Sequence, residues 1–311
     1  MKSVRIHEYG GRETLRYEES PMPQISDHEV LIKVIAAAVN PVDWKIREGY
    51  LKEMIPYQFP LILGWDLSGI VEKVGEEVTG FTPGDAVYSR PELSRNGAYA
   101  EYIAVSEAEL ARKPETVSFT ETASIPLAGI TAWEAVINRG QIAEGQSILI
   151  HAAAGGVGSL AVQLAKWRGA HVYATCSQRN LALVKSLGAD EVVDYEKTRF
   201  QDVIRDVDVV FDTIGGQVQE ASWSVLKPHG MLVSIVQPPS EERANQLNAR
   251  SEFVFIQPSS EILGELSQLI DNGTIRPVVG AEFSLKDVAR AHELSESGRA
   301  RGKIVLHVGV P

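Results

Sequence analysis

The chain is poor in cysteine and has no long apolar segment. Its 311 residues include one cysteine, Cys176, which excludes an intramolecular disulfide and any metal site built from several cysteines. The longest apolar runs fall well short of the roughly 20 residues that a membrane-spanning helix needs. The first residues, Met-Lys-Ser-Val-Arg-Ile-His-Glu, lack the apolar stretch of a secretory signal. We therefore expect a cytoplasmic protein that does not span a membrane.

Basic residues are scarce relative to acidic ones. Lysine and arginine number 30 against 41 aspartates and glutamates, which gives a net charge of -11. A surface of this sign repels phosphate backbones and anionic lipids, so neither nucleic acid nor a membrane surface is an expected partner. Hydrophobic residues make up 44% of the chain, enough for two domains with cores of their own.

Several catalytic motifs are absent as well. The seven histidines form no H-x-x-x-H or H-x-x-E-H pair, so no zinc pattern is present. There is no G-x-S-x-G elbow, and no tyrosine is followed by lysine four residues later, which argues against the short-chain reductases. His151 ends an apolar run, where a buried, hydrogen-bonded imidazole is a simpler interpretation than a base. Cys176 has no base beside it and is interpreted as a small apolar residue.

The chain changes its pattern near Pro114. Before it, short strand-like runs such as "EVLIKVIAAAV" (29–39) are separated by turn residues, which predicts a barrel-like β-domain. After it, strands alternate with helical periodicity, which predicts a parallel sheet covered on both faces. The predicted strands are 147–153, 171–176, 191–195, 208–213, 230–236 and 252–257, and the helices between them are 156–168, 179–187, 217–226 and 241–249.

The last residues contain two further helices and one strand. The helices are predicted at 260–271 and 286–297, and "KIVLHV" (303–308) is the final strand. Periodicity alone does not assign this tail to either domain. The run "EFVFIQ" (252–257) is apolar enough to be an edge strand that pairs across a two-fold axis.

A glycine cluster separates the strand at 147–153 from the helix that follows. Gly155, Gly156 and Gly158 lie at this junction, with Ala153 in the first position of a G-x-G-x-x-G pattern. Such a turn lets backbone N–H groups approach a pyrophosphate, and the helix N-terminus adds a positive dipole end. Because a strand precedes the cluster and a helix and second strand follow it, the pattern predicts a dinucleotide site. The alternative is a turn selected only for close packing.

The end of the second strand indicates which dinucleotide is bound. An NAD site usually carries an acid about 20 residues after the glycines, where it accepts from the ribose 2′-hydroxyl. Here the stretch after Cys176 is Ser-Gln-Arg-Asn, which offers donors and no acid. A guanidinium pairs well with phosphate oxygens, so the stretch favours NADPH over NADH. Alternatively, Ser177 only caps a helix and Arg179 only lies at its start.

A series of motifs along nearly the whole chain resembles one family. The motifs are "AAVNPVDWK" (37–45), "GWDLSG" (64–69), "GDAVYS" (84–89), "GAYAEY" (97–102), "ASIPLAGITAWEAV" (123–136), "HAAAGGVGSLAVQLAK" (151–166) and "GKIVLHV" (302–308). Together they are similar to the zinc-independent medium-chain dehydrogenase/reductases, within them to the quinone oxidoreductases of the zeta-crystallin type and the enone and alkenal reductases.

The resemblance implies a fold and an activity. The fold is α/β, with a Rossmann doubly wound parallel sheet (123–264) that binds NADP(H) and a GroES-like β-barrel catalytic domain (1–122 and 265–311). The implied activity is hydride transfer from NADPH to a quinone or an α,β-unsaturated carbonyl, and members of the family are commonly dimers or tetramers. Asn40 stands where the zinc-using branch has a metal-binding cysteine, and Trp65-Asp66 where it has a His-Glu pair, so no metal site is expected.

The resemblance also implies a set of coenzyme-binding residues. Asn40 and Lys45 are expected near the nicotinamide, as are Thr131, Val236 and the segment from Phe255 to Gln257. Gly155, Gly156, Val157 and Gly158 are expected around the pyrophosphate. The 2′-phosphate and adenine are assigned to Ser177, Arg179, Asn180 and Tyr195, and Gly302 and Lys303 are expected to close the site.

Each of these residues has a simpler alternative. In these alternatives Lys45 and Lys303 are solvated surface charges, Tyr195 only packs on its strand, and Val236 is a core residue. Trp44 and Trp65 either form an apolar wall for a flat substrate or pack in the interior. Asp43 is interpreted as a residue of a turn or of a salt bridge.

The candidate catalytic residues are Tyr50 and Asn40. A phenol at Tyr50 would donate a proton to the reduced substrate, with water as the alternative donor. Two other functions remain open at this point. One is a crystallin-like protein or sensor that binds NADPH without turnover, and the other is a zinc-free alcohol or sugar dehydrogenase.

Overall fold

A computed structural model describes residues 1–310, which form two compact units. Unit 1 contains Met1–Leu127, Gln257–Gly273 and the residues from Pro277 onward, and unit 2 contains Ala128–Ile256 with Thr274–Arg276. The predicted domain boundaries differ from this division, because residues 123–127 and 257–264 group with unit 1 and Thr274–Arg276 group with unit 2. The tail that periodicity left unassigned therefore contributes mainly to unit 1.

Unit 1 is built from strands of two sheets. A three-stranded sheet has the order β2-β1-β4, and a seven-stranded sheet has the order β15-β16-β3-β5-β6-β8, with β7 paired to β3. The strands are β1 (Lys2–Ile6), β2 (Arg16–Glu19), β3 (Glu29–Val39), β4 (Leu61–Ile62), β5 (Leu67–Val74), β6 (Ala86–Ser89), β7 (Tyr102–Ser106), β8 (Leu110–Arg112), β15 (Val279–Ser284) and β16 (Lys303–His307).

The long strand β3 organises unit 1. Its β-branched residues suit a pleated surface, and one face, with Val30, Ile32 and Val34, joins the main core. The register of β3 shifts between Val34 and Ala36, so the small residues Ala36 and Ala38 lie on the other face, where they pack against the helix residue Ala123. Because β16 pairs with β3, with Ile304 opposite Val39, the last strand of the chain lies directly beside the end of β3.

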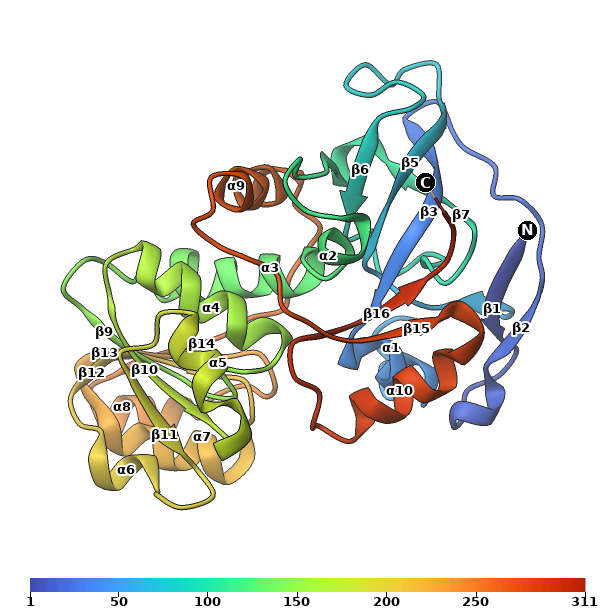
Figure 1. The fold of residues 1–311 in the computed structure, drawn as a ribbon. Helices are drawn as coiled ribbons and strands as arrows, with labels where there is room; N and C mark the ends of the chain where they lie inside the picture. The colour runs from blue at the N-terminus through green and yellow to red at the C-terminus, as the bar shows by residue number, and fades with distance from the viewer. Residues whose placement is uncertain (311) are drawn as a thin grey trace. The chain divides into compact units, whose positions relative to one another are not determined.

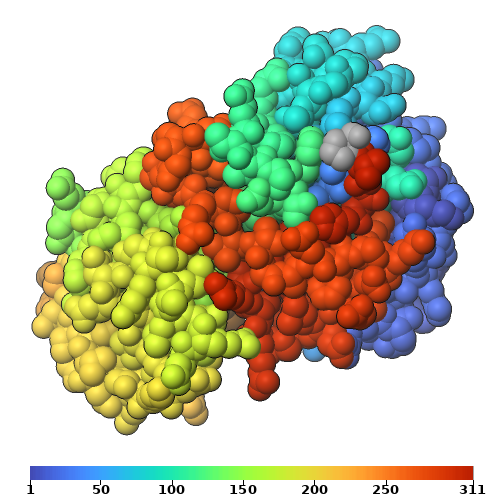
Figure 2. Space-filling model, viewed as in Figure 1, coloured from blue at the N-terminus to red at the C-terminus, as the bar shows by residue number. Residues whose placement is uncertain are grey.

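Four helices accompany these strands. They are α1 (Pro41–Arg47), α2 (Phe119–Ala123), α9 (Ser260–Asp271) and α10 (Val288–Glu296). Asn40 precedes α1 and Pro41 occupies its first turn, where a missing N–H costs nothing. Figure 2 shows the C-terminal residues, orange to red, against the blue N-terminal residues of the same unit.

Unit 2 is a six-stranded parallel sheet with helices on both faces (Figure 1). The strand order is β11-β10-β9-β12-β13-β14, the doubly wound order in which the connections reverse direction at the first strand, β9. The strands are β9 (Ser147–Ile150), β10 (His171–Cys176), β11 (Glu191–Asp194), β12 (Val207–Asp212), β13 (Leu226–Ser234) and β14 (Arg250–Phe253). The predicted fold class, a Rossmann sheet joined to a second β-rich part, is confirmed.

The helices of unit 2 alternate with its strands, as predicted. They are α4 (Gly156–Trp167), α5 (Leu181–Ser186), α6 (Phe200–Val203), α7 (Gly216–Ser222) and α8 (Glu241–Gln246), preceded by α3 (Pro126–Trp133), which contains the boundary between the units. One face of the sheet packs on Phe200, Trp223 and Ala244 from the later helices.

The predicted strands differ from the structure at some of their ends. The strand predicted at 147–153 ends at Ile150, and the one predicted at 230–236 spans Leu226–Ser234. The run 252–257 was expected to form the edge strand, but β14 spans Arg250–Phe253 and the residues from Val254 to Gln257 are not in a strand. β14 is nevertheless the edge of the sheet, paired only with β13. Within residues 1–310, none of the helices combines the length and the apolar character that crossing a membrane requires.

Candidate functional site

The turn between β9 and α4 has no room for a side chain at Gly158. A Cβ atom there would lie 2.4 Å from the carbonyl oxygen of Ala152 and 2.8 Å from the Cα atom of Ala153, closer than real contacts allow. Ala152 itself has a φ of 48°, in the left-handed region, which turns the chain sharply out of the strand. A Cβ at Gly155 would meet only the Ala152 oxygen, at 3.3 Å. Tight packing therefore requires glycine at one of these positions, and the other is free to serve an approaching ligand.

The helix that follows begins without a side-chain cap. Gly155 is the N-cap of the twelve-residue α4 and offers no side chain to the first-turn N–H groups. The first intrahelical bond runs from the Ser159 N–H to the Gly155 carbonyl, at 3.0 Å. The N–H groups before it, together with the helix dipole, form the kind of site that binds phosphate. The geometry of this turn fits a dinucleotide pyrophosphate.

The residues after β10 form a compact polar loop. The Asn180 Nδ2 donates to the Ser177 Oγ at 3.2 Å, and the Asn180 N–H donates to the Ser177 carbonyl at 2.9 Å. Ser177 and Asn180 are buried, whereas the Arg179 side chain is exposed. The Asn180 Oδ1 is buried and has no hydrogen-bond partner among the described residues. An orphaned acceptor beside a donor-rich loop fits the hydroxyl groups of an adenosine ribose.

Tyr195 lies beside this loop, because its N–H donates to the Cys176 carbonyl at 3.2 Å. Its side chain is 59% exposed, so the alternative of strand packing is wrong. Asp194, which ends β11 and pairs in register with Cys176, is an acid that the sequence reasoning did not consider. Its Oδ2 is buried, and the Lys197 ammonium lies 3.7 Å from it. The ribose end of the site therefore contains both the predicted donors and one carboxylate.

A buried carboxylate organises the ends of the next two strands. Asp212, the last residue of β12, accepts from the N–H groups of Ile214 and Gly215 at 2.9 and 2.8 Å. It also accepts from the Gln219 amide at 3.0 Å and from the Ser234 hydroxyl, at the end of β13, at 2.9 Å. The sequence reasoning missed Asp212, although an aspartate between an apolar strand and two glycines was a usable signal.

The residues expected at the nicotinamide from these strand ends are exposed. Val236, two residues after β13, is 40% exposed, so the alternative of a core residue is wrong. Phe255 is 47% exposed and Gln257 is also exposed. Thr131 lies on α3 and is buried.

His151 is a buried structural residue, as the simpler interpretation held. Its Nδ1 lies 3.1 Å from the Thr175 hydroxyl and its Nε2 lies 2.9 Å from the Ser222 hydroxyl. Burial lowers the pKa of His151 to about 4, so the ring is neutral at physiological pH. Cys176 is likewise buried, and desolvation with the nearby Asp194 raises the pKa of its thiol to about 11. Neither group is placed to react.

In unit 1, two predicted residues meet in a buried cluster. The Lys303 ammonium donates to the Asp66 Oδ2 at 2.8 Å and to the Asn40 Oδ1. The Asn40 Nδ2 donates to the same Asp66 oxygen at 2.8 Å, and the Leu127 N–H donates to the Asp66 Oδ1 at 2.6 Å. Lys303 is 6% exposed and Asp66 is fully buried, so the alternative interpretation of Lys303 as a solvated surface charge is wrong. Asp66, named only as a replaced metal ligand, is the group that joins Asn40 to Lys303.

Asp43 completes this cluster from α1. Its Oδ2 accepts from the Asn40 N–H at 2.8 Å and from the Tyr99 hydroxyl at 2.7 Å, and its side chain is fully buried. Desolvation raises the pKa of Asp43 to about 7, although the hydrogen bonds from Asn40 and Tyr99 act against that shift. We call Asn40, Asp43, Asp66 and Lys303 the Asn40 cluster. Its members come from the start of α1, the segment before β5 and the last strand.

The remaining aromatic and basic residues near α1 divide into exposed and buried groups. Tyr50 is 69% exposed, and its ring packs edge-on against Trp44, with centroids 6.1 Å apart. The Lys45 Nζ lies over the same indole, 5.8 Å from the Trp44 ring centroid. Trp65 is fully buried in the core, so of its two interpretations the one of packing in the interior holds. The Trp44 Nε1 is buried and has no partner among the described residues.

Gly302 precedes Lys303 with a φ of 62°, and a Cβ there would lie 2.2 Å from the Val278 carbonyl oxygen. This glycine sets the backbone that delivers Lys303 to the cluster. The predicted site residues thus fall in both units, with Asn40, Lys45, Tyr50, Gln257, Gly302 and Lys303 in unit 1 and the others in unit 2. No three His, Cys, Asp or Glu side chains of residues 1–310 gather as metal ligands.

Comparisons with known proteins assign this architecture to a family. Residues 26–115 match the alcohol dehydrogenase GroES-like domain, and residues 187–306 match the family described as zinc-binding dehydrogenase. The 2-methylene-furan-3-one reductase of Solanum lycopersicum is 38% identical over 99% of this chain and 79% of its own. The NADPH-dependent alkenal/one oxidoreductase of Arabidopsis thaliana shows the same identity and coverage.

A solved structure agrees with these relatives. The quinone oxidoreductase from Coxiella burnetii is 36% identical, with a TM-score of 0.93 over 99% of both chains. The resemblance drawn from the sequence motifs is therefore confirmed. The chain belongs to the medium-chain dehydrogenase/reductases, in the group that contains the quinone oxidoreductases and the alkenal/one oxidoreductases.

Proposed function

We propose that the protein is an NADPH-dependent reductase that transfers hydride to a quinone or to the β-carbon of an α,β-unsaturated carbonyl. The observation that carries the proposal is the uncapped first turn of α4, entered through a turn that excludes a side chain at Gly158. Two relatives named above are a 2-methylene-furan-3-one reductase and an alkenal/one oxidoreductase, both of which act on conjugated carbonyls by name.

Unit 2 would hold the phosphate groups of the coenzyme. The N–H groups of Gly156, Val157 and Gly158 bind the diphosphate, since no side chain caps them. Gly155, whose own N–H donates to the Ala152 carbonyl at 2.9 Å, lets the diphosphate approach because it carries no side chain. Ser177 and Arg179 bind the 2′-phosphate, Asn180 accepts from the ribose, and Tyr195 packs on the adenine. Lys197, 3.7 Å from Asp194, offsets the carboxylate that would otherwise repel a phosphate.

The Asn40 cluster would bind at the nicotinamide end. Of the three N–H groups of Lys303, two donate to Asn40 and Asp66, which leaves one donor on a fixed and buried cation. A preorganised donor of this kind favours charge that develops on a carbonyl oxygen during hydride addition. Bound NADPH supplies the hydride, and the residues of the chain supply position and a site that excludes water. Lys45, Thr131, Val236, Phe255, Gln257 and Gly302 are proposed as neighbours of the nicotinamide.

The chemistry is proposed to need no metal. Both Asp66 oxygens already accept hydrogen bonds, from Lys303, Asn40 and the Leu127 N–H, so its lone pairs are engaged. A quinone or enone is already electron-poor, and reduction needs only hydride and one proton. In an enone the hydride adds to the β-carbon and the proton to the α-carbon. Tyr50 is proposed to donate that proton, and its exposed phenol exchanges it with water.

The direct test is binding followed by turnover. Tryptophan fluorescence titrations with NADPH and NADH measure coenzyme affinity. NADPH oxidation is then followed with a panel of quinones and enones, and NADP⁺ reduction with a panel of alcohols. We expect saturable NADPH binding and turnover with quinones or enones, unchanged by metal chelators. Binding without turnover on any member would leave a non-catalytic NADPH-binding protein, and turnover only on alcohols with NADP⁺ would indicate a dehydrogenase.

The role of Tyr50 has a test of its own. Tyr50→Phe keeps the ring that packs on Trp44 and removes the phenol proton. If Tyr50 is the donor, kcat falls roughly 10-fold to 100-fold, the usual contribution of general acid catalysis, with unchanged affinity for NADPH. Unchanged kcat in the variant would assign the proton to water.

We further propose a cytoplasmic homodimer or homotetramer. β14 is an edge strand with a free row of backbone groups, and Phe253 at its end is 40% exposed. Light scattering coupled to size exclusion measures the mass of the particle. A mass near 34 kDa, that of one chain, would contradict the assembly.

A further inference from the structure

A chain of buried hydrogen bonds leads from the surface of unit 1 to Asp43. The Arg47 Nη1 lies 3.1 Å from the His292 Nδ1, and the His292 Nε2 lies 3.3 Å from the Tyr99 hydroxyl, which donates to the Asp43 Oδ2 at 2.7 Å. The side chains of Arg47, His292, Tyr99 and Asp43 are all fully buried. We call these four residues the donor chain.

The direction of each hydrogen bond in the donor chain is fixed by chemistry. A guanidinium only donates, so the His292 Nδ1 must accept from Arg47. Burial and the nearby Arg47 lower the pKa of His292 to about 3, so the ring is neutral and its one proton lies on Nε2. The Nε2–H therefore donates to the Tyr99 oxygen, which leaves the Tyr99 hydrogen for Asp43. Each residue of the donor chain therefore donates a hydrogen bond to the next, from Arg47 through His292 and Tyr99 to Asp43.

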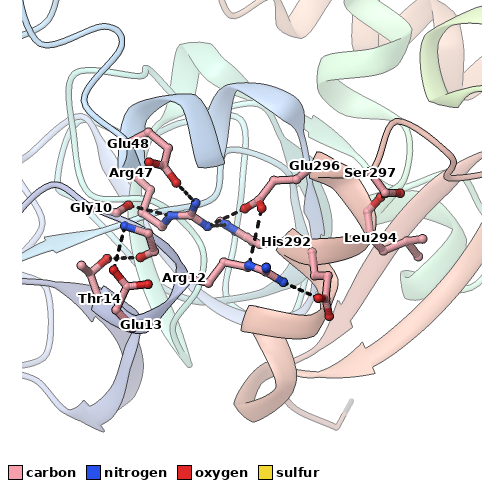
Figure 3. Close-up of polar contacts among 12 residues, drawn as sticks. Gly10, Arg12, Glu13, Thr14, Arg47, Glu48, His292, Leu294, Glu296 and Ser297 are labelled. Atoms are coloured by element: carbon pink, nitrogen blue, oxygen red, sulfur yellow. Dashed lines mark hydrogen bonds and ion pairs between the residues drawn. The ribbon is translucent and has the colours of Figure 1, made fainter.

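The outer end of the donor chain is anchored to three elements. The Arg47 Nε donates to the Gly10 carbonyl at 3.0 Å, its Nη1 donates to Glu296 at 2.8 Å, and its Nη2 pairs with Glu48. Figure 3 shows Arg47, the last residue of α1, between Gly10 of the N-terminal segment and Glu296 of α10. Arg12 extends the contacts to the surface, 3.5 Å from Glu296 and 2.7 Å from Glu293. The guanidinium is thus held firmly enough to orient the imidazole.

The inner end meets the proposed substrate site. The same Asp43 oxygen that accepts from Tyr99 also accepts from the Asn40 N–H, and Asn40 bonds directly to Lys303. The charged or titratable groups that face Asp43 are Lys303 on β16, Asp66 before β5, Tyr57 and Tyr99 from loops, Arg47 on α1 and His292 on α10.

We propose that Arg47, His292 and Tyr99 are positioning residues, whose one-way hydrogen bonds fix Asp43 and thereby hold Asn40 and Lys303 in the geometry needed for reduction. This inference rests on the proposed function. The three residues act through the Asn40 N–H, which donates to the same Asp43 oxygen as the Tyr99 hydroxyl. A chain of this kind strengthens each bond by polarising the next. Loss of one link should therefore weaken the bonds that follow it.

The test compares two substitutions of the same histidine. His292→Gln keeps an acceptor for Arg47 and a donor for Tyr99, whereas His292→Leu removes both and keeps an apolar side chain of similar volume. His307→Leu is the matched control, since His307 is an exposed histidine of unit 1 whose ring pairs only with Glu282. Each variant is assayed for kcat, KM and NADPH affinity, and infrared titration of the protonated carboxyl band measures the pKa of Asp43.

We expect His292→Leu to lower kcat roughly 10-fold, the effect of losing about 1.4 kcal/mol of transition-state positioning, while NADPH affinity changes less than twofold. The Tyr99 hydroxyl becomes a weaker donor, so the pKa of Asp43 rises. His292→Gln and His307→Leu should stay within twofold of the native enzyme in every measurement. Equal behaviour of the Gln and Leu variants would overturn the proposal, because the direction of the hydrogen bonds would then be irrelevant.

A second variant guards against loss of folding. Tyr99→Phe keeps the buried ring and removes only the hydroxyl, so it tests the same chain if His292→Leu does not fold. It should lower kcat and raise the pKa of Asp43. An unchanged pKa of Asp43 would overturn the proposal. If the native protein reduces no quinone or enone, the proposed function fails, and the infrared titrations still decide whether the donor chain controls Asp43.

Discussion

The glycine turn of unit 2 and the Asn40 cluster of unit 1 are built in opposite ways. The turn uses main-chain groups of seven consecutive residues, 152–158, and excludes side chains. The Asn40 cluster uses four side chains that are up to 263 residues apart in the chain, all at least 94% buried by their exposed fractions. A local main-chain site depends on backbone shape, whereas a buried polar cluster depends on every partner being present. The two regions should therefore respond differently to substitution.

The largest effect is expected at Lys303. Lys303→Met leaves the buried Asp66 carboxylate without its cation, which should cost about 3–5 kcal/mol of unfolding free energy and lower kcat more than 100-fold. Denaturant titration and quinone reduction measure the two effects. Lys166→Met in unit 2 is the matched control, because the Lys166–Asp190 pair has the same 2.8 Å separation but is about one-third exposed. That surface pair should be worth no more than about 1 kcal/mol.

A double variant sharpens this prediction. Adding Asp66→Asn to Lys303→Met removes the uncompensated charge, so most of the lost stability should return while activity stays low. A double variant no more stable than the single one would mean that Asp66 and Lys303 do not act as an ion pair.

The next largest effect is a contrast in pH dependence between the regions. Burial raises the pKa of Asp43 from 3.8 to about 7, so its contribution to stability is present below pH 4 and is lost as the pH rises through 7. Burial lowers the pKa of His151 to about 4, so its contribution is present above pH 6.5 and is lost as the pH falls through 4. Both contributions should be large enough to measure, because a tenfold change in a proton-binding constant on folding corresponds to roughly 1.4 kcal/mol.

Unfolding free energies measured between pH 4 and 8 test this contrast. Asp43→Asn should flatten the decline between pH 4 and 7, and His151→Asn should flatten the decline below pH 6.5. If Asp43→Asn left the slope between pH 4 and 7 unchanged, Asp43 would be an ordinary ionised carboxylate.

A smaller effect is expected in the glycine turn, where position decides the outcome. Gly158→Ala forces a Cβ against the Ala152 oxygen and the Ala153 Cα, and should cost about 2 kcal/mol of stability and weaken NADPH binding at least 10-fold. Gly155→Ala is the matched control for stability, with a single contact of 3.3 Å and a φ of -79° that alanine adopts readily. Thermal unfolding measures the stability of both variants, and fluorescence titration measures NADPH binding by the Gly158 variant. Equal losses of stability at the two positions would contradict the packing argument.

The smallest effect is expected at Arg179, whose side chain is exposed. Arg179→Ala should weaken NADPH binding about 10-fold, as expected for one charge-assisted contact of about 1.4 kcal/mol, and leave NADH binding nearly unchanged. Arg168→Ala, at the C-terminal end of α4, is a control that removes an arginine from the far end of the same helix that the coenzyme meets at its N-terminus. Equal weakening of NADPH binding and NADH binding would show that Arg179 does not bind the 2′-phosphate.

The sequence predicted unit 2 better than unit 1. β10 was predicted with its observed bounds, and α4 to within one residue, because alternating strands and helices carry two clear periodicities. The predicted strand 252–257 was wrong in part because Val254 and Ile256 are buried outside any strand, and burial alone mimics a strand pattern. β14 pairs only with β13, and among residues 1–310 no second neighbouring strand is present to extend it to Gln257.

In the candidate site, the sequence located residues but not their partners. Asn40 and Lys303 were both named, yet Asp66 was seen only as a replaced metal ligand and Trp65 as a possible wall. The importance of Asp43 was missed, since a single aspartate in a turn has many roles and only its complete burial singles it out. Asp194 was not considered, and Asp212 was missed although the two glycines that follow its strand gave a signal.

The sequence by itself determined the order of strands and helices, the glycine turn before α4 and the donor-rich loop after β10. These features depend on residues that are close in the chain, so local spacing records them. Only the tertiary structure decided that Lys303 lies against Asn40 and Asp66 and that His292 connects Arg47 to Tyr99. Such contacts join segments more than 190 residues apart, and their energy comes from burial and hydrogen bonding that exist only once both segments have packed together.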